Sequence, residues 1–133
     1  MSVFLDTNIV IYLIERTSDQ GLAVAKCIKN LIAQGQRLVV SDLVRMECRV
    51  RPLRLNDAIT LSAFDGYFSS EDLDITPITA SVCDRAAAIR ARYNFRPMDS
   101  LHLAAAIEHG CQLFLTHDLR LKDFSNITIE VPS

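Results

Sequence analysis

The sequence predicts an α/β fold in which helices cover both faces of a central parallel sheet of about five strands. Three observations lead to this expectation. Short apolar runs alternate with longer stretches of helical periodicity along the 133 residues. The runs, among them VFL, LVV and LFL, lack alternating polar residues, as expected of strands buried on both faces. Strands that are separated by helices pair in parallel, because each helix returns the chain to the starting end of the sheet.

The first half of the chain is expected to run strand, helix, helix, strand, helix, helix. Gly35 closes the second helix, because glycine adopts the left-handed conformation that ends a helix without strain. Pro52 stops the third helix, because proline lacks an N–H donor. The expected strands are Ser2–Leu5 and Arg37–Val40, and the expected helices are Thr7–Arg16, Asp19–Gln34, Asp42–Val50 and Asn56–Phe68.

The second half is expected to contain a strand, two helices and two more strands. Pro97 precedes the second of these helices, and Gly110 closes it. Because the chain shows no repeat or linker, one domain is expected over residues 1–133. The expected strands are Leu73–Thr76, Gln112–Leu115 and Ile127–Val131, and the expected helices are Ala80–Tyr93 and Ser100–His109.

Composition indicates a small globular protein of a reducing compartment. Half of the residues are hydrophobic, so a core can form without disulfides or a structural metal. The cysteines form no C-x-x-C pair, which argues against zinc and favours small core residues. No signal peptide is recognisable and no apolar run approaches about 20 residues, so we expect a cytoplasmic protein that makes no membrane contact. The cysteines are Cys27, Cys48, Cys83 and Cys111.

The net charge of −2 does not indicate a nucleic-acid-binding protein, but the arginines are clustered. Two interpretations stay open: the clusters are solvated helix faces, or they flank an acidic centre and hold phosphates. Under the second interpretation, Arg45 and Arg49 are candidate RNA-binding residues. The first cluster holds Arg45, Arg49, Arg51 and Arg54, and the second holds Arg85, Arg90, Arg92 and Arg96.

Four carboxylates are expected to meet at one edge of the sheet. Asp6 directly follows the first strand, and Asp118 lies just past the fourth. Glu47 lies on the helix after the second strand, and Asp99 lies at the start of the helix that leads into the fourth. Ligand sites of parallel α/β sheets lie outside the carboxyl ends of the strands, which is where these acids fall.

Three of these acids also have local explanations. Asp6 can be the N-cap of the helix from Thr7, and Asp99 can be the N-cap of the helix from Ser100. Asp118 can be a turn residue. Position alone therefore does not make any of the three a functional residue.

Glu47 is harder to explain locally. Helical spacing places it on one face with Leu43, Met46 and Val50. A glutamate on an apolar face is rarely buried without a partner. Its local alternative is a solvated position at the rim of a short helix.

Together, the four carboxylates favour a metal-dependent reaction on phosphates. Carboxylates held close together repel one another and raise one another's pKa unless a cation is present. Oxygen ligands select hard cations such as Mg²⁺ or Mn²⁺. Such ions activate water and stabilise a pentavalent phosphate, so the pattern favours phosphodiester hydrolysis.

Four stretches of the chain resemble those of PIN-domain ribonucleases, and most closely those of VapC-type toxins of toxin–antitoxin pairs. The resemblance covers essentially the whole chain and implies a PIN-like three-layer fold. It also implies a Mg²⁺-dependent (or Mn²⁺-dependent) endoribonuclease that acts as a toxin, a cognate antitoxin partner and a homodimer. The stretches are FLDTNIVIYLI, VSDLVRMEC, MDSLHLAAAIEHGC and LFLTHDLRLKDF.

The resemblance also implies roles for individual residues. Thr116 and Asn8 match polar residues of the family, and Asn8 is expected to support the first acid by a hydrogen bond. Asp123 is an alternative or additional fourth acid, although Asp118 ranks first because it keeps the Thr-x-Asp spacing. His117 lies at a variable position and receives no catalytic role. The catalytic, metal-binding acids implied by the resemblance are Asp6, Glu47, Asp99 and Asp118.

Other functions fit the sequence less well or equally well. A PIN nuclease that processes RNA without being a toxin fits equally well. A catalytically inert PIN-type scaffold is disfavoured, because all four acids are present. A phosphoacceptor receiver or a dehalogenase-type phosphatase needs further acids beside Asp6, where Thr7 and Asn8 stand. His102 and His109 have no neighbouring metal-ligand pattern and are interpreted as ordinary helix residues.

Overall fold

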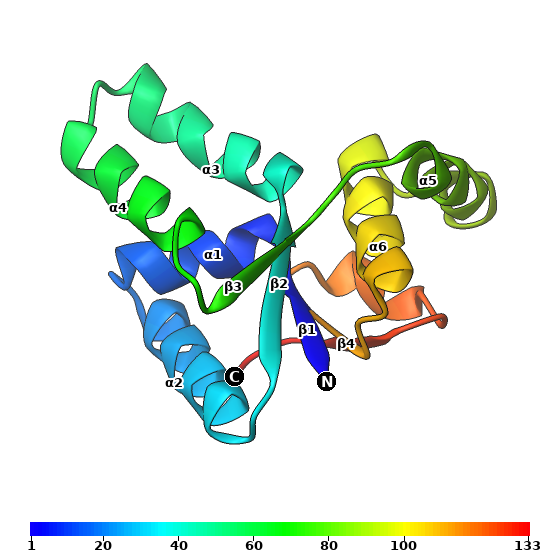
Figure 1. Cartoon of the computed structure of the whole chain (residues 1–133), viewed down its shortest axis with the longest axis horizontal. Helices are drawn as coiled ribbons and strands as arrows, with labels where there is room; N and C mark the ends of the chain where they lie inside the picture. The colour runs from blue at the N-terminus through cyan, green and yellow to red at the C-terminus, as the bar shows by residue number, and fades with distance from the viewer.

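Five strands form one parallel sheet in the order β3-β2-β1-β4-β5 in the computed structural model, which describes residues 1–133 (Figure 1). Every neighbouring pair is parallel, so the five carboxyl ends lie at the same edge. The expected parallel sheet is therefore confirmed. The strands are β1 (Ser2–Leu5), β2 (Arg37–Ser41), β3 (Leu73–Thr76), β4 (Leu113–Leu115) and β5 (Thr128–Glu130).

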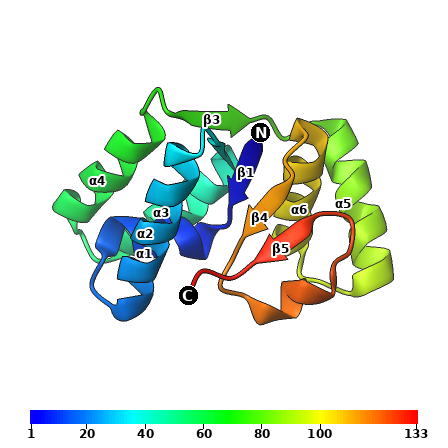
Figure 2. The ribbon, with the colours of Figure 1, turned by 90° about the horizontal axis from the view of Figure 1, so that it is seen from below.

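Helices cover both faces of the sheet, which confirms the expected three layers. Figure 2 shows α1 to α4 on one side and α5 and α6 on the other, where a short 3-10 helix, η1, also lies. The sequence did not predict η1. The helices are α1 (Thr7–Glu15), α2 (Asp19–Ala33), α3 (Asp42–Arg54), α4 (Ala58–Phe68), α5 (Ala80–Tyr93), α6 (Pro97–His109) and η1 (Leu119–Asp123).

The order of the strands reverses between β1 and β4. From β1 the chain moves outward to β2 and β3, and it then returns through α5 and α6 to β4, which pairs with β1 on its other side. In open α/β sheets, the ligand site lies at this reversal, outside the carboxyl ends of the strands. The topology thus singles out the space beyond Leu5 and Leu115, which are partners in the register of the two strands.

The three central strands are buried on both faces, which explains their continuous apolar sequences. Phe4, Val39 and Phe114, one from each of these strands, have no exposed surface. The rings of Phe4 and Phe114 stack with their centroids 5.3 Å apart. This packing fixes the relative positions of the strand ends that carry the candidate site.

Helix α3 passes through Pro52, so the expectation that this proline stops the helix is wrong. The helix ends only two residues later, at Arg54, so the missing N–H costs a single bond near its end. Helical hydrogen bonding resumes when the Leu55 N–H donates to the Arg51 carbonyl at 3.0 Å. The proline ring is buried, and its packing offsets part of that cost.

Helix α6 starts at Pro97 rather than at the expected Ser100. Proline is favoured in the first turn, because the N–H that it lacks would have no partner within the helix. Arg96 is consequently the N-cap, and Asp99 lies inside the first turn. The explanation of Asp99 as an N-cap is therefore wrong.

The four cysteines are free thiols, but they are not all core residues. Cys48 and Cys111 are buried, Cys27 is half-buried and Cys83 is exposed. The interpretation of all four as core residues is wrong for Cys83, which lies on the solvent face of α5. No helix combines the length and the apolar character that a membrane span requires.

Gly21 allows α2 to approach the end of α1 closely. A Cβ at this position would lie 2.9 Å from the Arg16 Cα and 3.0 Å from the Tyr12 carbonyl oxygen. We expect Gly21→Ala to lower the free energy of unfolding by about 1–3 kcal/mol, because backbone atoms must shift. This expected net loss already includes the gain of about 1 kcal/mol that alanine brings to a helix.

Gly66 of α4 provides the control, because a Cβ there would meet no atom within 4 Å. Gly66→Ala should raise the free energy of unfolding by about 0.5–1 kcal/mol through helix propensity. Urea unfolding followed by circular dichroism measures both variants. Equal stabilisation by the two substitutions would show that the contact between α1 and α2 does not depend on glycine.

Candidate active site

The candidate site lies where β1 and β4 end side by side. The Asp6 N–H donates to the Leu115 carbonyl at 3.0 Å, which extends the pairing of the two strands by one residue. Thr116 continues β4 in the same way, because its N–H donates to the Glu130 carbonyl at 3.1 Å. Asp6 and Thr116 therefore leave the sheet next to each other.

Asp6 is both a helix cap and part of the acidic centre. One carboxylate oxygen caps α1 by accepting from the Thr7 N–H at 2.8 Å. The other accepts from the Thr116 hydroxyl at 2.8 Å and from the Asn8 amide at 3.4 Å. Burial raises the pKa of the Asp6 carboxyl, and the nearby His102 and the hydrogen bond from Thr116 offset only part of the rise.

Thr116 and Asn8 connect the two strand ends into one hydrogen-bonded unit. The Thr116 hydroxyl donates to Asp6 and accepts from the Asp118 N–H at 2.9 Å. The Asn8 carbonyl oxygen accepts from the His117 N–H at 3.0 Å. Both residues contact Asp6 and thereby hold it between the two strand ends.

Glu47 reaches the same centre from α3. Its Oε1 accepts from the Thr7 hydroxyl at 2.5 Å and lies 2.7 Å from Nε2 of His102. Burial acts to raise the pKa of Glu47, but the hydrogen bonds from His102 and Thr7 outweigh it, and the pKa is lowered. Glu47 is thus held as a carboxylate beside Asp6.

The helix face that holds Glu47 is not the apolar face that the spacing suggested. Val44, Cys48 and Pro52 form the buried face of α3, whereas Met46 and Val50 are exposed. Glu47 is half-buried because it borders α1 and α6, where Thr7 and His102 lie. A polar partner is present, as expected, although the argument from the apolar face was wrong.

His102 is one of the residues of this centre that the sequence analysis missed. Its side chain is only 2% exposed, and its Nε2 faces Glu47, with Asp6 4.0 Å away. Its Nδ1 is buried without a hydrogen-bond partner. The interpretation of His102 as an ordinary helix residue is therefore wrong. Its spacing of three residues from Asp99, on one face of α6, is the signal that could have found it.

Asp99 and Asp118 form the second half of the centre, and two arginines bind both. Nε of Arg96 donates to Asp99 at 2.9 Å, and its Nη2 lies 3.5 Å from Asp118. Nε of Arg120 donates to Asp118 at 2.9 Å, and its Nη2 lies 3.4 Å from Asp99. The hydrogen bond from Arg120 lowers the pKa of Asp118. The sequence analysis gave no role to Arg120.

The remaining candidate residues lie apart from the acidic centre. Asp123, at the end of η1, is exposed and makes no hydrogen bond or ion pair with the centre. Arg49 forms an ion pair with Asp65, which connects α3 to α4. Arg45 is exposed and has no ion pair. His117 packs against Tyr12 with ring centroids 4.8 Å apart, and burial lowers its pKa.

The expectation of general repulsion among the four acids is corrected by these contacts. The pKa is raised for Asp6 but lowered for Glu47, which is hydrogen-bonded to His102 and Thr7, and for Asp118, which accepts from Arg120. Asp99 still contributes to the raised pKa of Asp6, so the two halves of the centre interact through their charges. Positive charge is thus already present among the acids.

The donor set fits a hard divalent cation, although the side chains do not enclose one as they stand. All four acids offer oxygen ligands, and the guanidinium groups of Arg96 and Arg120 lie against Asp99 and Asp118 as a cation would. No three His, Cys, Asp or Glu side chains converge into a metal-binding group. The carboxylates of Asp99 and Asp118 are directed to the arginines instead.

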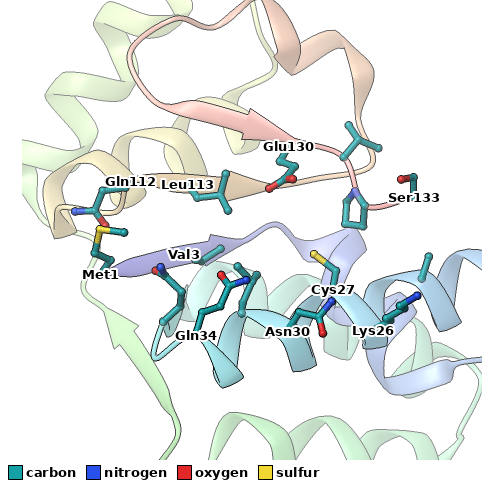
Figure 3. A pocket seen from close by; sticks show the side chains of 15 residues that line it. Met1, Val3, Lys26, Cys27, Asn30, Gln34, Gln112, Leu113, Glu130 and Ser133 are labelled. Carbon is teal, nitrogen blue, oxygen red and sulfur yellow. The ribbon is translucent and has the colours of Figure 1, made fainter.

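A separate cavity of about 520 Å³ lies between α2 and the strands β1, β4 and β5 (Figure 3). Cys27 and Lys26 line it from α2, and Glu130 lines it from β5. None of the four acids is among its lining residues, so it is distinct from the candidate site.

Comparison with known proteins identifies the fold. The model of the PIN domain family matches residues 3–127. VapBC2 from Rickettsia felis, bound to a DNA fragment from its promoter, gives a TM-score of 0.83 at 20% identity and covers 100% of both chains. FitAcB from Neisseria gonorrhoeae gives 0.74 at 17% identity over 96% of this chain and 95% of that chain. No curated protein sequence matches the chain.

A third solved structure is the Mycobacterium tuberculosis toxin VapC20, described as cleaving the sarcin–ricin loop. It gives a TM-score of 0.72 at 17% identity, over 95% of this chain and 98% of that chain. At these identities the likeness establishes the fold alone, and the fold agrees with the family match. Because that match spans nearly the whole chain and includes all four acids, the protein belongs to the PIN-domain family.

Proposed function

We propose that the protein is a Mg²⁺- or Mn²⁺-dependent endoribonuclease that hydrolyses RNA phosphodiester bonds and acts as the toxin of a toxin–antitoxin pair. One observation carries this proposal: four acids from distant parts of a PIN-family chain gather beyond the ends of β1 and β4. The solved structures of VapBC2 and VapC20 support the toxin assignment and the RNA substrate. A cytoplasmic homodimer with a cognate antitoxin belongs to the same proposal.

The metal would be held by Asp6, Glu47, Asp99 and Asp118. When bound, Mg²⁺ or Mn²⁺ supplies Lewis acidity that activates water and offsets negative charge on the phosphate. The protein's own contribution is to hold the ligands in fixed orientations. Thr116 and Asn8 orient Asp6, while Thr7 and His102 orient Glu47.

A PIN nuclease that processes RNA without an antitoxin is the alternative. The PIN domain endonuclease Utp24 gives a TM-score of only 0.55, whereas VapBC2 gives 0.83. The greater likeness to toxin–antitoxin proteins favours the toxin. An inert scaffold is disfavoured, because all four acids are present and each of them is tied into the hydrogen bonds of the centre.

The acids should be required for cleavage. Asp6→Asn, Glu47→Gln and Asp99→Asn should each lower the cleavage rate by at least about 10²-fold, because each removes a proposed metal ligand with little change of shape. Double variants should lose little more, since the ligands act as one unit. The measurement is cleavage of total cellular RNA with and without Mg²⁺, followed by mapping of the new ends.

Two exposed acids, Asp84 on α5 and Asp123 on η1, provide controls for this experiment. Asp84→Asn on α5 should leave the rate unchanged. Asp118→Asn should be damaging while Asp123→Asn is not, because only Asp118 is joined to Asp99 through the arginines. Full activity of any variant of the first three acids would remove that residue from the site.

Toxicity should depend on the same centre. Expression of the protein without an antitoxin should arrest growth, whereas expression of the Asp6→Asn variant should not. Growth curves of a strain that lacks the antitoxin gene, with protein levels matched by immunoblot, provide the measurement. Unimpaired growth with the intact protein would favour the alternative of an RNA-processing nuclease.

The stability of the metal-free protein should reveal the cost of ionised Asp6. Its pKa is raised by burial, so the stability that the neutral carboxyl contributes is present at low pH and is lost as pH rises through the folded-state pKa. Asp6→Asn should therefore be at least as stable as the parent at pH 7 in EDTA. This advantage should shrink as pH falls through that pKa.

Mg²⁺ should raise the melting temperature of the parent, because a ligand that binds only the folded chain stabilises it by mass action. The response of Asp6→Asn should be smaller. Thermal melts across a Mg²⁺ titration at several pH values test both expectations. A parent that is indifferent to Mg²⁺, with Asp6→Asn less stable at pH 7, would mean that Asp6 is only a helix cap.

A further inference from the structure

Arg96 and Arg120 hold Asp99 and Asp118 from two different elements. Arg96 is the N-cap of α6, and Arg120 lies in η1, so the four charges form a closed network at the rim of the centre. Two guanidinium groups cancel the two carboxylates. This half of the proposed metal site is therefore electrically neutral before any cation arrives.

The acids are fixed in this network, whereas the arginine side chains can leave it. The side chains of Asp99 and Asp118 are only 9% and 16% exposed, but those of Arg96 and Arg120 are 65% and 55% exposed. The Arg96 backbone is anchored, since its carbonyl accepts from the Ser100 N–H and hydroxyl, both at 3.1 Å. Only the guanidinium groups need to move to free the carboxylate oxygens.

A cation and the arginines compete for the same oxygen atoms. The guanidinium groups contact both carboxylate oxygens of Asp99 and of Asp118. A divalent cation that binds these carboxylates must displace at least part of the arginine contacts. The two arginines would then stand beside the cation with fewer contacts to the carboxylates that neutralise them.

We propose that Arg96 and Arg120 exchange partners, pairing with Asp99 and Asp118 in the metal-free protein and binding RNA phosphates once a divalent cation takes those acids. The guanidinium group suits both partners, because its planar fork matches carboxylate and phosphate oxygens alike. With the cation bound, the network gains an excess of two positive charges, which favours a polyanion. The inference rests on the proposed function and names the residues that make RNA binding depend on the metal.

The exchange predicts opposite effects on metal and on RNA. Arg120→Gln and Arg96→Gln should each tighten Mn²⁺ binding, because a guanidinium group that competes for the carboxylates is removed. In each variant, the other arginine still pairs with the buried Asp99. Both should weaken binding of a mixed-sequence single-stranded RNA in Ca²⁺. The slope of log affinity against log salt should fall by about 0.7 for each lost phosphate contact. If the arginine had only a structural role, its replacement would weaken the binding of both Mn²⁺ and RNA or of neither.

The experiment combines titration calorimetry with Mn²⁺ and fluorescence anisotropy with the RNA, whose integrity is checked on a gel. Arg85→Gln is the matched control, because Arg85 pairs with Glu108 at the other end of α6 and should leave both affinities unchanged. Arg120→Lys keeps the charge but loses the fork. It should tighten Mn²⁺ binding less than Arg120→Gln does, and thermal melts of every variant report its folding.

The outcomes separate this inference from the proposed function. A parent that binds no Mn²⁺ would overturn the proposed metal-dependent function and the exchange with it. A parent that binds Mn²⁺, with glutamine variants that bind it equally or more weakly, would overturn the exchange alone. Tighter Mn²⁺ binding with unchanged RNA affinity and salt slope would also overturn it, since the arginines would then be counter-ions without a role toward phosphate.

Discussion

The pairing of β1 with β4 is the constraint on which the rest of the centre depends. It brings Asp6 and Thr116, which are 110 residues apart, to a hydrogen bond of 2.8 Å. From that bond the other contacts follow, because Thr116 also accepts from the Asp118 N–H and Asp6 begins the helix that carries Thr7 and Asn8. A shift of register between these strands would separate the contacts that Asp6 and Asn8 make with Thr116 and His117.

The sequence predicted the layers and the edge of the sheet that carries the acids, for one physical reason. Strands such as Ser2–Leu5 are buried on both faces and read as continuous apolar runs, so they are recognisable and must be parallel. Parallel strands share one carboxyl edge, which places Asp6 and Asp118 at the same edge without knowledge of the strand order. The order β3-β2-β1-β4-β5 itself was not predicted, because pairing between distant strands leaves no local pattern.

Contacts between side chains of different elements were the part that the sequence could not supply. His102 contacts Glu47 of α3, and Arg120 contacts Asp99 of α6. The sequence around His102 looks like an ordinary helix, and that around Arg120 looks like an ordinary turn. The same limit explains the error over Glu47. Helical spacing correctly grouped it with Met46 and Val50, but it could not tell which face of α3 the sheet and α4 would bury.

The two halves of the centre solve the problem of burying carboxylates in different ways. Asp6 and Glu47 contact hydroxyl, amide and imidazole groups rather than a guanidinium group. Asp99 and Asp118 are paired with arginines that cancel theirs. In the proposed function, the first half would attract the cation. The arginines of the second half limit the repulsion among the four acids while no cation is bound. In this arrangement, Asp6 and Glu47 would provide the attraction for the cation. The arginine pairs of Asp99 and Asp118 would preserve the stability of the metal-free protein.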